Sequence, residues 1–323
     1  MPTAPKSLAS GCQKCHTTNK LNTCGKCKVV QYCGREHQAA DWPEHKSICK
    51  RIGRARSELE AEQAESAALD AYAGQLGTLL PGGTDVDVLL KLATTELEVD
   101  NRLAVRSGLD HILEMTKEAK TPMLGIADLA PACFLRLGRD QEAYDFMKWW
   151  ITTPDTLMSP PRQPYTAVKG DNILETATIF MGKCPSLAFM ATLTLLKLRL
   201  LMDLQSLQRS RKEVPGHLPQ ELLDEVRKNM VSSAITRSLI ERDDHAESIK
   251  LLVEDVKALY HGVKGANAHF WPAILSPADD LVAQSDGWNY GDKGEMQMAL
   301  QFTYKAWAET PGAVDAIEAL SRE

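Results

Sequence analysis

Six of the eight cysteines in this 323-residue chain lie between residues 12 and 49. Cys12 and Cys15 form one CxxC pair, and Cys24 and Cys27 form a second. Such a pair makes a tight turn that directs two thiolates at one cation, with each sulfur about 2.3 Å from a zinc ion. A segment of about forty residues cannot bury enough apolar surface to fold unaided. The cysteine spacing therefore predicts a small module that is organised by metal ions.

The redox environment decides between metal ligation and disulfide bonding. The first ten residues, MPTAPKSLAS, contain no apolar stretch of the kind a secretion signal carries, so we expect an intracellular protein, in the cytoplasm, the nucleus or both. Thiols are kept reduced in these compartments, which favours thiolate ligands over disulfides. The two isolated cysteines, Cys133 and Cys184, lie in apolar, helical-looking sequence and are expected in the core.

Two further pairs of ligands follow the CxxC pairs. Cys33 precedes His37 by four residues, and His45 precedes Cys49 by the same interval. On a helix, residues four apart lie on one face, so each pair is able to bind one cation. The four pairs supply eight ligands, enough for two tetrahedral zinc sites. Spacing alone does not decide how these ligands divide between the sites.

The full pattern from Cys12 to Cys49 is C-x2-C-x8-C-x2-C-x4-Y-C-x3-H-Q-x3-W-x2-H-x3-C. It resembles the MYND zinc finger family, over about an eighth of the chain. The family usually has cysteine where this sequence has His37, but imidazole is itself a good zinc ligand and we retain it. His16, directly after a CxxC pair, is expected to be a bystander. The interleaved sites of the family imply one zinc ion on Cys12, Cys15, Cys33 and His37, and a second on Cys24, Cys27, His45 and Cys49.

The resemblance also implies a binding surface. MYND fingers typically accept short proline-containing peptides beside the small hairpin, against a Gln and a Trp that correspond to Gln38 and Trp42. An indole offers a flat apolar face to proline rings, and an amide bonds a peptide backbone. Packing of Trp42 inside the small module is the alternative interpretation. Family members often have serine where this chain has Gly25, so the choice of peptide is expected to differ.

Charge is distributed unevenly along the chain. Residues 1–56 hold about eleven Lys and Arg against about three acidic residues, roughly +8, which leaves about −14 for the rest. Six thiolates bound to two Zn²⁺ ions subtract about two positive charges from the finger. The finger also lacks the recognition helix of a DNA-reading zinc finger. We therefore do not expect nucleic acid as the partner, and we interpret the basic run 50–56 as a solvated helix start, with a nuclear localisation signal as the alternative.

Residues 51–323 are predicted to form an all-α domain, after a disordered segment at 1–10 and the finger at 11–50. Residues 57–76 continue as a helix, within a possible helical linker at 51–80 that stops near Pro81, and a second helical stretch from Thr84 is expected to break near Gly108. Residues 187–202 are the most apolar stretch, but they are too short for a membrane span and predict a buried helix. Further helices are expected at about 124–137, 139–152, 172–182, 186–207, 219–240, 245–262 and 294–308.

Two segments of this region have the small-residue spacing of a tetratricopeptide hairpin, one starting at Gly138 and one at Gly294. Two partial matches do not make an array. We therefore expect irregular helical hairpins with tetratricopeptide-like character, a layout that resembles fungal MYND proteins. Two longer loops are predicted, a proline-rich connection at 154–172 and an aromatic-rich segment at 266–293 whose rings are expected to cap the core.

These features favour a zinc-binding adaptor whose finger captures a proline-containing segment of a partner protein. A chromatin-associated transcriptional co-regulator with weak nucleic-acid contact is the alternative. A lysine methyltransferase fits less well, because the chain has no Gly-rich loop before the finger and no Asn-His pair. The strings GxSxG, HExxH, GxxxxGK[ST] and GxGxxG are also missing, so we expect no enzymatic activity. The sequence does not identify the partner or the oligomeric state.

Overall fold

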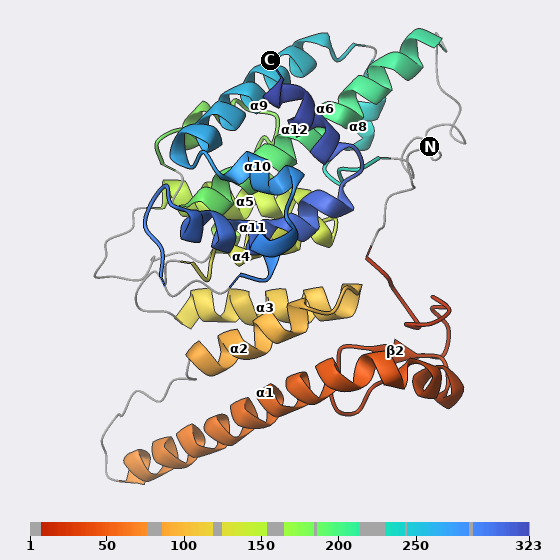
Figure 1. Cartoon of the computed structure of the whole chain (residues 1–323), viewed down its shortest axis with the longest axis vertical. Coiled ribbons are helices and arrows are strands. Elements are labelled where there is room, and N and C mark those ends of the chain that lie inside the picture. The colour runs from red at the N-terminus through yellow and green to blue at the C-terminus, as the bar shows by residue number, and fades with distance from the viewer. Residues whose placement is uncertain are drawn as a thin grey trace. The chain divides into compact units, whose positions relative to one another are not determined.

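Helices make up most of the computed structural model, and a short hairpin near the N-terminus is the one sheet within its described residues (Figure 1). The structure describes residues 8–75, 86–118, 125–153, 165–183, 186–213, 230–242, 244–283 and 287–322. It divides into two compact units, here called the finger unit (Ser7–Cys133) and the helical unit (Phe134–Thr156 and Pro161–Glu323).

The finger unit begins with the hairpin and the longest helix of the chain. Strand β1 (Asn22–Thr23) pairs antiparallel with β2 (Gln31–Tyr32), and helix α1 (Arg35–Gln75) follows almost at once. The helix predicted at 57–76 is therefore the second half of a longer helix that starts within the finger. Its predicted stop at Pro81 lies outside the described residues.

Two helices, α2 (Val86–Leu97) and α3 (Arg102–Glu118), pack together, and α2 also packs along α1 (Figure 1). The predicted break near Gly108 is wrong, because the chain turns at 98–101 and Gly108 lies inside α3. A Cβ at Gly108 would lie 2.9 Å from the side chain of Leu97 and 3.1 Å from the carbonyl oxygen of Ala93. The glycine thus permits a close helix crossing and does not end a helix.

The segment just before the finger is part of this unit. Leu8 is buried, and Ala9 forms a parallel β-bridge with Asn101. The backbone N–H of Arg102 donates to the carbonyl oxygen of Ala9 at 2.9 Å. Residues 8–10, which we expected to be disordered, are thus bound to the start of α3, while residues 1–7 lie outside the described residues.

The helical unit is arranged around α6 (Leu187–Glu213), against which α9 (Ala246–Ala266) and α11 (Lys293–Glu309) pack. Residues 191–201 of α6 are all buried, as expected for the most apolar stretch of the sequence. Among the described helices, none has both the length and the apolar character that a membrane span requires. The other helices are α4 (Leu129–Arg136), which crosses the unit boundary, α5 (Asp140–Thr152), α8 (Arg237–Ile240), α10 (Phe270–Leu275) and α12 (Ala313–Ser321), with 3-10 turns at Tyr165–Ala167, Ala177–Phe180 and Ala278–Leu281.

Most of the helices predicted for this unit are present, with α4, α5, α6, α9 and α11 close to the expected ranges. Of the range 219–240, residues 219–229 lie outside the described residues. The prediction is wrong at 230–236, which form turns, and only the four residues of α8 at its end are helical. Helices α10 and α12 were not predicted. Phe270 and Trp271 of the aromatic-rich segment cap the core as expected, but Trp288 and Tyr290 of the same segment are exposed.

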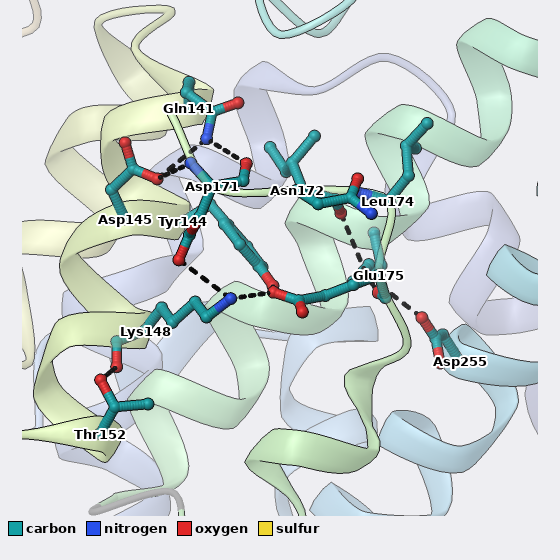
Figure 2. Close-up of polar contacts among 12 residues, drawn as sticks. Gln141, Tyr144, Asp145, Lys148, Thr152, Asp171, Asn172, Leu174, Glu175 and Asp255 are labelled. Atoms are coloured by element: carbon teal, nitrogen blue, oxygen red, sulfur yellow. Dashed lines mark hydrogen bonds and ion pairs between the residues drawn. The ribbon is translucent and has the colours of Figure 1, made fainter. Parts of the chain in front are cut away.

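The helix predicted at 172–182 is wrong, because side chains from other helices bind both the Glu175 side chain and the backbone of this segment. Figure 2 shows the arrangement: Glu175 accepts hydrogen bonds from the Tyr144 hydroxyl and the Lys148 ammonium. Asp255 of α9 accepts the backbone N–H of Ala177 at 2.8 Å. Backbone donors that a carboxylate satisfies are not available for a helical ladder. The segment therefore runs as turns and ends in a single 3-10 turn.

Two cations in the apolar helix α6 are buried with carboxylate partners. The Lys197 ammonium lies 3.2 Å from the carboxylate of Asp255 and donates to the carbonyl oxygens of Ile173 and Glu175. Arg199 lies 2.9 Å from the carboxylate of Asp140. Buried charges persist in folded proteins when they are paired and hydrogen-bonded. The two cations that interrupt the apolar run are therefore internal contacts: Lys197 holds the irregular segment around Ile173 and Glu175 against α6, and Arg199 holds the start of α5 there.

Candidate metal centre

Four buried side chains converge between the hairpin and the first turns of α1. Cys24 and Cys27 come from the turn that joins β1 to β2, and His45 and Cys49 lie one helical turn apart on α1. The sulfurs of Cys24 and Cys49 are 3.7 Å apart, and the Cys27 sulfur is 3.6 Å from Nε2 of His45. We call this cluster the buried site, because all four residues are buried.

A second cluster in the finger is more open to solvent. It consists of Cys12, Cys15, Cys33 and His37, of which only Cys12 is buried and Cys15 is exposed. The sulfurs of Cys15 and Cys33 are 3.7 Å apart, and Nδ1 of His37 lies 3.1 Å from the Cys33 sulfur and 3.4 Å from the Cys12 sulfur. We call this cluster the open site. Cys33 precedes α1, which begins at Arg35, so this pair does not stack on a helix as predicted.

The separations between these donor atoms fit tetrahedral zinc. Sulfurs at about 2.3 Å from one ion in tetrahedral directions lie about 3.8 Å apart, which is close to the 3.7 Å found in each cluster. In both clusters all four ligand atoms lie within 4.8 Å of one another. The clusters divide the eight ligands as the family resemblance implies. Four protein ligands leave no open position for water or substrate, so both zinc ions are structural.

Each CxxC turn is closed in the same way. The backbone N–H of His16 donates to the carbonyl oxygen of Cys12 at 2.8 Å, and Lys28 makes the equivalent bond to Cys24 at 2.9 Å. Both residues adopt the left-handed conformation, with φ of 58° at His16 and 60° at Lys28. This conformation turns the chain away directly after the second cysteine. His16 is accordingly exposed and lies outside both clusters.

The cysteine thiolates of each cluster need a cation to balance their negative charge. Burial raises the pKa of the Cys12 thiol, but backbone N–H groups outweigh it and lower the pKa to about 5. The same balance lowers the pKa of Cys24 to about 6. At Cys49, by contrast, burial and the neighbouring thiolates raise the pKa to about 12. Because thiolates this close repel one another, full deprotonation of each cluster requires the positive charge that Zn²⁺ supplies.

The two residues predicted to contact a peptide lie next to the zinc ligands on α1. Gln38 follows His37 directly and is half-buried, and Trp42 lies one turn further along the helix. The Trp42 side chain is 39 % exposed, and its ring stands edge-on to the ring of His45 at 6.2 Å between centroids. Trp42 is therefore not enclosed within the module. Gly25 faces open space, with no atom within 4 Å of a Cβ built there.

Sequence reasoning missed one polar residue that supports the buried site. Arg56, assigned to a solvated helix start, donates from Nε to the carbonyl oxygen of Cys27 at 2.9 Å and pairs with the buried carboxylate of Glu96 on α2. Its spacing from the ligands was a usable signal, since His45, Cys49 and Arg56 recur at the intervals of one helix face.

Residues 12–49 match the family model described as MYND finger. Rho GTPase-activating protein gacZ from Dictyostelium discoideum is 43 % identical over 49 residues, which is 15 % of this chain and 5 % of that protein. Histone-lysine N-methyltransferase ASHR1 from Arabidopsis thaliana is 40 % identical over 52 residues, 16 % of this chain and 11 % of the relative. Hypoxia-inducible factor prolyl hydroxylase from Caenorhabditis elegans is 46 % identical over 41 residues, 13 % of this chain and 6 % of the relative.

The chain thus spans about a tenth or less of the length of these relatives. Their names describe three different activities, and the similarity covers about the length of the finger alone. No solved structure matches the chain.

Proposed function

Because residues 12–49 are a MYND finger, a zinc-binding module of protein–protein interaction, we propose that this protein is an adaptor whose finger captures proline-containing segments of partner proteins. The observation that carries the proposal is the exposure of Trp42 beside the buried site. A large aromatic side chain costs free energy when it is left in water, and exposed tryptophans are typical of binding surfaces.

The zinc sites hold the proposed surface in place from both sides. Gln38 follows the open-site ligand His37, and Trp42 contacts the buried-site ligand His45. Gln38 and Trp42 are four residues apart on α1, so their side chains share one face of the helix. A rigid indole next to an amide suits an extended peptide, because proline rings pack on the indole while the amide bonds the peptide backbone.

The adaptor is proposed to be non-enzymatic and to act inside the cell, in the cytoplasm, the nucleus or both. Two observations support this. The zinc sites have four protein ligands each and so offer no catalytic position. Both sites also depend on reduced thiols, which intracellular conditions maintain.

Contacts of the basic run disfavour the alternative of a co-regulator that binds nucleic acid. Arg51 pairs with Glu98, and Arg56 pairs with Glu96. Both pairs lie within the finger unit, so these guanidinium groups are already neutralised by carboxylates. A phosphate backbone would have to displace those carboxylates, which weakens the electrostatic term that nucleic-acid binding requires.

Replacing Trp42 with Ala tests the proposal. The full-length protein is titrated with an array of synthetic proline-containing decapeptides, each paired with a version in which Ala replaces the prolines. Wild-type protein is expected to bind a subset of the array in a proline-dependent way. Trp42→Ala is expected to lower that affinity about tenfold or more, since hot-spot aromatics contribute at least about 1.4 kcal/mol.

A matched control is available in the helical unit, where Trp288 is also 39 % exposed. Trp288→Ala is expected to leave peptide affinity unchanged, and Trp42→Ala is expected to retain two zinc ions. Equal affinity of wild type and Trp42→Ala, or binding that ignores the proline replacements, would contradict the proposal.

A further inference from the structure

The two zinc sites of the finger differ in how they are joined to the rest of the finger unit. We infer that the buried site is locked to helices α1 and α2 by Arg56, a positioning residue, whereas the open site, which has no such contact among the described residues, releases its zinc ion faster. The inference concerns zinc binding itself and does not depend on which peptide the finger captures.

Helix α1 aligns the buried-site ligands with Arg56. His45, Cys49, Ile52 and Arg56 follow one another at intervals of four, three and four residues, which places them on one face of the helix. Ile52 between them is fully buried. The face that carries two zinc ligands therefore also carries the guanidinium, and all three contact the turn that holds Cys24 and Cys27.

Arg56 binds this turn and helix α2 at the same time. Its Nε donates to the carbonyl oxygen of Cys27 at 2.9 Å, and its terminal nitrogen pairs with the carboxylate of Glu96. Glu96 is fully buried, and its other oxygen lies 3.6 Å from Nε2 of His111 on α3. A planar guanidinium directs its donors in fixed directions, so it links the zinc turn to α2 rigidly. Residues that orient metal ligands in this way contribute strongly to metal affinity.

The net charge of the two zinc sites gives a second reason to assign different behaviour to them. Three thiolates, one imidazole and one Zn²⁺ ion leave about one negative charge in each site. In the buried site that charge is shielded from water, and the guanidinium of Arg56, which is shared with the carboxylate of Glu96, lies at the backbone of a ligand. In the open site, Cys15 is exposed and Cys33 and His37 are partly exposed, so water screens the charge and reaches the ligands.

A further contact holds the finger to the start of α3. The Asn101 side chain donates to the carbonyl oxygen of Val29 at 3.0 Å and accepts the backbone N–H of Ala104 at 2.8 Å. Val29 and Val30, directly after the Cys27 turn, are fully buried. Asn101 also contacts Gln13 beside Cys12 at 3.4 Å, so this contact supports both sites. The sites differ in burial, because all four ligands of the buried site are buried whereas only Cys12 is buried in the open site.

Zinc release from the full-length protein tests the inference. The zinc-loaded protein is mixed with an excess of a chromogenic chelator, and release is followed in time. Wild type is expected to release one zinc ion per chain in a fast phase and one in a slow phase. Arg56→Lys, which keeps the charge but cannot span both partners, is expected to accelerate the slow phase about tenfold and leave the fast phase unchanged.

Two controls separate positioning from general stability. Arg54 is exposed on α1, and Arg54→Gln is expected to leave both phases unchanged. Leu92 is fully buried in α2, and its apolar side chain can make no hydrogen bond to the zinc turn. Leu92→Ala is expected to destabilise the same helices. At equal loss of unfolding stability, Arg56→Lys is expected to release the slow zinc faster than Leu92→Ala does.

Three results would overturn the inference. The first is a single release phase for both zinc ions of the wild type. The second is a slow phase that Arg56→Lys leaves at the wild-type rate. The third is equal acceleration by Leu92→Ala and Arg56→Lys at matched stability, which would mean that Arg56 acts only through the fold.

Discussion

His37 is the ligand at which this finger departs from the MYND pattern. Its Nδ1 lies 3.1 Å from the Cys33 sulfur and 3.4 Å from the Cys12 sulfur, in the position of the fourth ligand of the open site. Imidazole and thiolate are both good ligands for zinc. The replacement of cysteine by histidine therefore preserves the site and removes one negative charge from it.

Substitution of His37 is expected to change the zinc content in a defined way. His37→Ala leaves three ligands in the open site, so one zinc ion per chain is expected to remain after exhaustive dialysis. His37→Cys restores the usual family ligand and is expected to keep two, as is the control His16→Ala. Elemental analysis measures the zinc to protein ratio. Retention of two zinc ions by His37→Ala would show that another group is the fourth ligand.

The zinc ligands were predictable from sequence because cysteine and histidine have few other uses at such regular spacing. The position of Arg56 on the ligand face of α1 could have been found from its spacing, but its partners could not, because Cys27 and Glu96 lie 29 and 40 residues away along the chain. Trp42 was identified through the family resemblance, and only the structure distinguishes its exposed position from a packed one. The contacts of a residue are thus predictable from sequence when its partners belong to the same short motif.

Helix boundaries were predictable from sequence where a glycine or proline itself ends the helix. They were not predictable where tertiary packing determines the boundary. Gly138 ends α4 with a positive φ of 67°, as a glycine between two helices is expected to do. Gly108 is also a glycine, but it does not end a helix, since it lies inside α3 against Leu97 and Ala93. The segment 172–182 has helical composition, yet Asp255 of α9 accepts the backbone N–H of Ala177, and Asp145 of α5 accepts that of Gly170 just before the segment.

Replacement of helical glycines by alanine tests this distinction. Gly108→Ala places a Cβ at 2.9 Å from Leu97 and is expected to destabilise the finger unit by about 1 to 3 kcal/mol, despite the better helix propensity of alanine. Gly262 of α9 has only sulfur atoms of Met181 and Met190 at 4.0 Å from such a Cβ. Gly262→Ala is therefore expected to stabilise the helical unit by about 1 kcal/mol.

Urea unfolding read out by pulsed hydrogen exchange reports the stability of each unit separately in both variants. A gain of stability in Gly108→Ala would mean that α2 and α3 cross less closely than the structure indicates. A loss in Gly262→Ala would show that the space beside α9 is filled.

At the scale of the whole molecule, zinc and apolar packing organise different parts of the chain. All eight zinc ligands lie in the finger unit, where α1 starts within the finger and packs against α2. The helical unit is arranged around the buried helix α6 and its paired cations Lys197 and Arg199. The protein is therefore best regarded as a zinc-organised interaction unit followed by a helical unit with its own apolar core.

Hydrogen exchange of the full-length protein, with zinc bound and after complete chelation, tests this account most directly. Because zinc binding supplies part of the folding free energy of the finger unit, chelation is expected to raise exchange across residues 8–75 and in α2 and α3. Helices α5, α6, α9 and α11 are expected to keep their protection. Unchanged protection of residues 8–75 without zinc would contradict the account, and so would loss of protection in α6 and α9.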